Sequence, residues 1–154
     1  MTQTINTEKA LEGTPRPHHL RGDAVYQQKG NKYELKGTAY FSSEHPSIGD
    51  RSEKYLANPH VNSGDLCFAV WNAAHIIGDR LGYKQRTLVD EVRVKPIKPI
   101  PPDTELSLEV RIEERSETID RNNKPYTIGR IEAKLYQNKV LLAEVYADAF
   151  ARKN

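Results

Sequence analysis

Residues 60–78, HVNSGDLCFAVWNAAHIIG, constrain the fold of this chain more than any other stretch of its 154 residues. A helix on a protein surface shows a stripe of apolar residues every three to four positions. The helix predicted here is apolar on nearly all sides, at Leu66, Cys67, Phe68, Ala69, Val70, Trp71, Ala73, Ala74, Ile76 and Ile77. We therefore expect a buried helix that is wrapped by a sheet.

Polar residues and glycines mark the two ends of this helix. Ser63 is a plausible N-cap, and Gly64 and Asp65 follow in the first turn, where an acidic side chain suits the helix dipole. Gly78 or Gly82 is expected to end the helix.

Alternation of apolar and polar residues predicts strands in much of the remaining chain. The predicted strands cover residues 33–41, 86–94, 104–114, 126–137 and 140–151. In the third of these strands, Leu106, Leu108, Val110 and Ile112 are expected to point inward. The second half of the chain therefore reads as almost all strand.

Residues 1–30 are polar, lack clear periodicity and contain Pro15 and Pro17. They are predicted to form an N-terminal arm, which leaves residues 31–154 as a single domain. Residues 42–62 are predicted to form a long polar loop.

The fold class expected from this order is α+β. A long central apolar helix wrapped by a curved antiparallel sheet of about five strands is the hotdog architecture. A sheet of this size leaves an edge strand exposed. We therefore expect an edge-paired homodimer or a higher homo-oligomer.

Composition narrows the classes of function. Charged residues make up 29% of the chain, but the net charge is only +2 and no basic block is interleaved with aromatic residues, so nucleic-acid binding is not expected. The single cysteine, Cys67, cannot form an internal disulfide. No apolar run of membrane-spanning length and no CxxC, HExxH or HxH pattern occurs. A cytoplasmic, soluble protein with no membrane partner, metal or other cofactor is predicted.

Residues 60–74 resemble the loop-to-helix motif of hotdog acyl-thioesterases. The HVN at residues 60–62 is similar to that of the 4-hydroxybenzoyl-CoA and acyl-ACP types. Those types carry an aspartate four to six residues before the histidine. In this chain Lys54 and Leu56 occupy those positions. The phenylacetyl-CoA type has an aspartate inside the helix, where this chain has Asn72. Both expected carboxylates are therefore missing.

An asparagine at that helical position resembles the FcoT-type long-chain fatty-acyl thioesterases, which use tyrosines and asparagines without a general base. Their Tyr, Asn, Asn spacing falls on Tyr55, Ser63 and Asn72, with Ser63 as the departure. A further tyrosine of that family could correspond to Tyr26 or Tyr33. The resemblance implies fatty acyl-CoA or acyl-ACP substrates, and it extends to enzymes that add glycine to an enoyl-ACP.

A thioester site is also consistent with the chemistry of these residues. The N–H groups of Gly64 and Asp65 would point at a carbonyl oxygen and stabilise an oxyanion. Asn72 can orient a water or hold the thioester, but an amide cannot take a proton. The candidate bases are His60, Asp65 and His75, or there is no strong base at all.

Candidate substrate-binding residues are apolar or aromatic. Leu66, Phe68 and Trp71 are expected to line an acyl tunnel, and Tyr33 is included from the resemblance. Together with the residues above, these form the predicted site, in which Tyr55, His60, Ser63 and Asn72 are the catalytic candidates.

Each candidate also has an ordinary structural interpretation. Asn72 would need hydrogen-bond partners in any buried helix, and Asp65 could be only a first-turn acid. His75 and Asp79 are spaced as an i, i+4 pair that faces solvent or an interface. His45 precedes a proline and is more typical of a turn.

Three functions remain open at this point. The first is hydrolysis, or a related acyl transformation such as glycine addition, on an acyl-CoA or acyl-ACP. The second is dehydration or hydration of a 3-hydroxyacyl or enoyl thioester, which requires a histidine and a carboxylate near the helix start, supplied by His45 or His60 with Asp65. The third is a non-catalytic acyl-binding protein that keeps the pocket.

Overall fold

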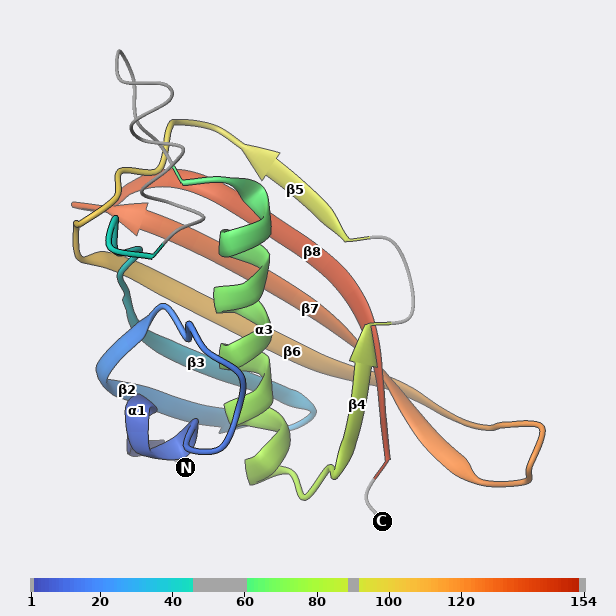
Figure 1. Ribbon diagram of the computed structural model, residues 1–154. Coiled ribbons are helices and arrows are strands. Elements are labelled where there is room, and N and C mark those ends of the chain that lie inside the picture. The colour runs from blue at the N-terminus through green and yellow to red at the C-terminus, as the bar shows by residue number, and fades with distance from the viewer. Residues whose placement is uncertain (1, 46–60, 89–91, 153–154) are drawn as a thin grey trace.

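The computed structural model describes residues 2–45, 61–88 and 92–152. A curved antiparallel sheet packs against one helix of 18 residues, α3 (Ser63–Arg80), which runs across its inner face (Figure 1). A second helix, α1 (Thr7–Ala10), is a single turn near the N-terminus. Neither helix of the described residues has the length and apolar character that a membrane crossing requires.

Eight strands of the described residues form the sheet. They are β1 (Thr2–Asn6), β2 (Leu20–Lys29), β3 (Lys32–Ala39), β4 (Gln85–Leu88), β5 (Arg93–Pro96), β6 (Leu106–Ile119), β7 (Pro125–Gln137) and β8 (Val140–Arg152). Their order in space is β1-β2-β3-β6-β7-β8-β4, and β5 also pairs with β8. All the described pairings are antiparallel.

The prediction of about five strands is wrong. The residues expected to form an N-terminal arm supply β1 and β2, which continue the sheet beyond β3 (Figure 1). The strand expected over residues 86–94 is instead two short strands that pair with different halves of β8. Alternation is weak in the sequence of β2 because Gly22 and Ala24 carry little or no side chain and the apolar Val25 is exposed. The register of β2 against β3 also shifts between Arg21 and Val25, around Gly22 with a φ of +63°.

The prediction of a central helix enclosed by the sheet is also wrong. The sheet covers only one side of α3, where residues such as Ala69, Ala73 and Ile77 are buried. Other positions, such as Cys67 and Trp71, are only half-buried. A helix whose sequence is apolar on all sides is therefore not always buried on all sides within a single chain.

The inward face of β6 agrees with its sequence pattern. Leu106, Leu108 and Val110 are buried in the core beneath α3, and Ile112 is partly buried against it. Each fully buried side chain of this size contributes about 1.5–3 kcal/mol to stability. This packing fixes the helix on the sheet.

The loop over residues 11–19 joins α1 to β2 and brings the N-terminal segment to α3. Leu11 anchors one end of the loop in the core. The other end is fixed to the sheet, because the N–H of Tyr40 donates to the carbonyl oxygen of His19 at 2.9 Å. This anchored loop holds two adjacent histidines, His18 and His19, beside the helix.

Candidate functional site

The start of α3 is organised by Asn62, which is its N-cap. The side-chain oxygen of Asn62 accepts a hydrogen bond from the N–H of Asp65 at 2.9 Å, and its side-chain nitrogen donates to the Asp65 carboxylate. Ser63, the predicted cap, is instead the first helical residue. Asn62 therefore both ends the loop and holds the carboxylate of Asp65 in place.

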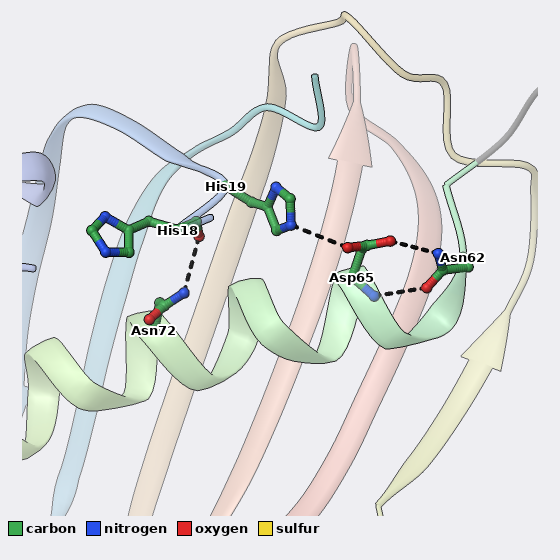
Figure 2. Close-up of polar contacts among 5 residues, drawn as sticks. All are labelled: His18, His19, Asn62, Asp65 and Asn72. Atoms are coloured by element: carbon green, nitrogen blue, oxygen red, sulfur yellow. Dashed lines mark hydrogen bonds and ion pairs between the residues drawn. The ribbon is translucent and has the colours of Figure 1, made fainter. Parts of the chain in front are cut away.

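A buried histidine lies next to this carboxylate. Nε2 of His19 is 3.3 Å from Oδ1 of Asp65, and the side chain of His19 is only 2% exposed. The histidine comes from the 11–19 loop and the carboxylate from the first turn of α3, 46 residues apart in sequence (Figure 2). His19 has a φ of +60°, which is uncommon for a residue other than glycine.

Aromatic rings surround the imidazole of His19. The ring centroids of Phe41, His45 and Phe68 lie 4.9, 6.0 and 6.4 Å from it. Burial lowers the pKa of His19 below its ordinary value of 6.5, and the nearby Asp65 carboxylate opposes this shift without overcoming it. His19 is thus neutral at neutral pH.

A neutral imidazole can act as a base through the nitrogen that carries no proton. If Nε2 of His19 donates to Asp65, Nδ1 is the proton acceptor. A carboxylate that holds one nitrogen of an imidazole fixes both its orientation and its tautomer. A chain of hydrogen bonds therefore runs from Asn62 through Asp65 to His19, which is a candidate general base.

Asn72 supports the same loop from further along α3. It is buried, and its side-chain nitrogen donates to the carbonyl oxygen of His18 at 3.2 Å (Figure 2). This contact matches the structural interpretation of Asn72, because the amide bonds to the backbone of the neighbouring segment. It also holds the residue that precedes His19.

Other predicted residues near the helix start have different positions. Tyr55 and His60 lie outside the described residues. Ser63 and Gly64 are exposed in the first turn. The N–H of Asp65 is already bonded to Asn62, so of the two predicted oxyanion donors only Gly64 has no partner assigned to its N–H.

Tyr33 lies away from this group. Burial and a hydrogen bond to Glu114 raise the pKa of Tyr33 to about 12. Glu114 also accepts a hydrogen bond from Tyr83, which follows the C-terminal end of α3, at 2.9 Å. Because 15 residues of helix span about 22 Å, the structure does not bring Tyr33 to Asp65.

The apolar candidates lie along α3. Leu66 is buried, whereas Phe68 and Trp71 are half-buried. Trp71 lines an apolar cavity of about 60 Å³ between the helix and the sheet, opposite Ile131 and Phe150. Phe68 and Trp71 also line a wider hollow beside Asn72. These positions are suitable for an apolar group of a substrate.

The expected pair His75–Asp79 is confirmed, with Nε2 of His75 3.4 Å from Oδ2 of Asp79. The ring of His45 lies 6.0 Å from that of His19, between centroids. Among the described residues, no cluster of histidine, cysteine and acidic side chains could hold a metal ion.

Sequence analysis missed His19. It lies in the predicted arm, and no spacing relates it to a helix that begins more than 40 residues later. The one available signal is the pair His18-His19 after two prolines, which does not identify a partner. The contact with Asp65 depends on the loop anchored by Leu11 and on the positive φ of His19.

Solved structures share this fold. A phenylacetic acid degradation-related protein from Ralstonia eutropha, described as a "putative thioesterase", has a TM-score of 0.54 and 14% identity over 95% of this chain and 99% of that chain. A "putative thioesterase" from Lactococcus lactis has a TM-score of 0.53 and 12% identity over 83% of this chain and 88% of that chain. An uncharacterized protein from Erwinia carotovora has a TM-score of 0.53 and 8% identity over 84% and 92%.

At these identities the likeness shows a common fold alone. No family model matches the sequence, and neither does any curated protein.

Proposed function

We propose that this protein hydrolyses fatty acyl thioesters, with His19 as the general base and Asp65 as the residue that orients it. The observation that carries the proposal is the 3.3 Å contact between buried His19 and Asp65 at the start of α3. The fold shared with proteins described as thioesterases supports a thioester as the substrate.

The proposed reaction uses water as the nucleophile. Neutral His19 takes a proton from the water, whose oxygen attacks the thioester carbonyl carbon. The resulting oxyanion is stabilised by the N–H of Gly64 in the first turn of α3. When the tetrahedral intermediate collapses, the carbon–sulfur bond breaks and the proton on His19 passes to the departing sulfur. The products are a carboxylic acid and a thiol.

Other residues have supporting roles in this proposal. Asn72 positions the loop that carries His19, through the carbonyl of His18. Phe68 and Trp71 bind the acyl group. Roles for Tyr55, His60 and Ser63 in holding the thioester rest on the sequence resemblance.

Hydration or dehydration of an enoyl or 3-hydroxyacyl thioester is the second candidate. A specific observation favours it, because this chemistry also needs a histidine and a carboxylate near the helix start, and His19 with Asp65 provides both. Hydrolysis is preferred because the neighbours in fold are described as thioesterases.

We further propose that the substrate is carried by CoA or by acyl carrier protein, that no metal or other cofactor takes part, and that the protein acts as a cytoplasmic homodimer. The helix α3 supports the dimer, because its half-buried apolar residues Cys67 and Trp71 would gain from being covered. Size-exclusion chromatography with light scattering tests this state, and a monomer at micromolar concentration would contradict it.

Product analysis tests the reaction. The wild-type protein and His19→Gln are incubated with saturated, enoyl and 3-hydroxyacyl thioesters, with and without glycine, and the products are identified by mass spectrometry. Free acid from the wild type, reduced about 100-fold or more in His19→Gln, supports the proposal. A dehydrated or hydrated thioester supports the second candidate instead, and a mass gain of glycine indicates addition. Binding of acyl-CoA without any product would indicate a non-catalytic protein.

A further inference from the structure

A second hollow opens beside His19, on the side where the 11–19 loop meets the start of β2. Its volume is about 500 Å³, and His19 forms part of its wall. Arg16 and Arg21 also line it, while Glu8 of α1 is its one acidic lining residue among those described. The hollow is therefore basic and lies directly next to the proposed base.

The two arginines are available to a ligand. Both are exposed, and no described carboxylate lies within ion-pair distance of either guanidinium. Arg21 is held over the ring of Tyr40, with its guanidinium carbon 3.4 Å from the ring centroid. Stacking fixes the plane of the guanidinium and leaves its N–H groups at the edge to donate.

An arginine fixed in this way matches a phosphate. The planar guanidinium donates two parallel hydrogen bonds to a phosphate or carboxylate. Ser42 adds a hydroxyl to the same wall. A hollow lined by two arginines, the hydroxyl groups of Ser42 and Tyr40, and one acidic side chain among the described residues therefore selects an anionic group.

We propose that this hollow binds the phosphate of a 4′-phosphopantetheine arm, with Arg16 and Arg21 as its ligands. The proposal rests on the proposed function, because it places the carrier of the thioester in a hollow that His19 lines and that the acyl-binding residues Phe68 and Trp71 do not line. CoA and acyl carrier protein share this phosphate, so the hollow recognises their common chemistry. The 11–19 loop and the start of β2 would then supply both the base and the site for the carrier.

Binding without catalysis is the first test. The wild-type protein is titrated calorimetrically with 4′-phosphopantetheine and with pantetheine, which differ only in the phosphate. We expect the phosphorylated compound to bind about tenfold more tightly or better, and Arg16→Gln and Arg21→Gln to remove the difference. Arg115→Gln, which removes an exposed arginine from β6, is the matched control and should keep it. Equal affinities in the wild type would overturn the proposal.

Kinetics with matched thioesters is the second test. For Arg21→Gln we expect KM to rise about tenfold for acyl-CoA, for acyl carrier protein or for both, while kcat stays within about twofold. The KM for the N-acetylcysteamine thioester, which has no phosphate, should not change. A rise confined to one carrier identifies that carrier as the source of the phosphate. An equal rise for the N-acetylcysteamine thioester, or no rise for either carrier, would overturn the proposal.

The two tests separate this inference from the proposed function. If phosphate-dependent binding requires the arginines but no thioester is turned over, the phosphate site stands and the proposed hydrolysis fails. If N-acetylcysteamine thioesters are hydrolysed but neither test shows any effect of the phosphate, the proposed hydrolysis stands and the phosphate site fails.

Discussion

His19 owes its chemistry to two opposing effects of its surroundings. Burial among Phe41 and Phe68 disfavours the charged imidazolium, and the carboxylate of Asp65 favours it. Burial is the larger effect, so the pKa lies below 6.5. The histidine is therefore kept in the form that can accept a proton.

The pH dependence of hydrolysis follows from this shift. Only neutral His19 can take a proton from water, so kcat/KM should fall as the pH drops through the His19 pKa. Because that pKa is lowered, the fall should have its midpoint below pH 6.5. Asp65→Asn removes the effect that raises the pKa, so its midpoint should lie lower still. A midpoint above 6.5 in the wild type, or an upward shift in Asp65→Asn, would contradict the role of His19.

At the scale of the element, Asn62 at the N-terminus of α3 has both a structural and a proposed chemical role. Its oxygen caps the helix through the N–H of Asp65, and its nitrogen bonds the carboxylate of Asp65. A single side chain thus links helix stability to the orientation of the base.

Asn62→Ala should therefore lower both stability and activity. Losing the cap should cost about 1 kcal/mol in the free energy of unfolding, measured by urea denaturation. The freed carboxylate should also lower kcat, by about tenfold, since Asp65 would no longer hold His19 in one orientation. Ser63→Ala is the stability control, because the residue after the cap should change the free energy of unfolding by less than about 0.5 kcal/mol. A larger loss of stability in Ser63→Ala than in Asn62→Ala would contradict the assignment of the cap.

Sequence periodicity was sufficient to predict β3, β6, β7 and β8, but not the division of residues 86–94 between β4 and β5. The expected strand over residues 126–137 is β7, and that over 140–151 is β8, each within a residue or two. The helix was also expected close to where α3 lies. Its cap was misplaced by one residue, since Asn62 and Ser63 have similar capping propensity and only the backbone at the cap distinguishes them.

At the scale of the whole molecule, the N-terminal segment is part of the sheet. Strand β2 pairs with β1 on one side and β3 on the other, and it buries Leu20, Ala24 and Tyr26. The polar composition of residues 1–30 concealed this strand, because only Gly22 and Ala24 stand between Leu20 and Tyr26 at the alternating positions. The candidate base, His19, therefore belongs to the same folded domain as the sheet.

Hydrogen exchange tests this placement. Peptides that cover residues 20–29 should exchange slowly, at a rate comparable with those of β6, because their amides are bonded within the sheet. Timed exchange of the folded protein, followed by quenching, pepsin digestion and mass spectrometry of the peptides, gives the measurement. Exchange of residues 20–29 within seconds, while β6 stays protected, would show a detached arm and would leave Asp65 without His19.

The site also depends on the assembly of distant segments. His19 comes from the first loop and Asp65 from the middle of the chain, and only the packing of that loop on α3 joins them (Figure 2). Spacing in the sequence carries no information on such a contact. The apolar helix was recognisable in the sequence, whereas the candidate base became apparent only from the fold.

The most direct measurement is the kcat for acyl-thioester hydrolysis in Asp65→Asn and Asp79→Asn. Each variant neutralises a carboxylate of α3 that is paired with a histidine, at 3.3 Å for His19–Asp65 and 3.4 Å for His75–Asp79. If His19 and Asp65 perform the chemistry, Asp65→Asn should lower kcat about tenfold to 100-fold, and Asp79→Asn should leave it within about threefold. Equal activities in the two folded variants would contradict the assignment.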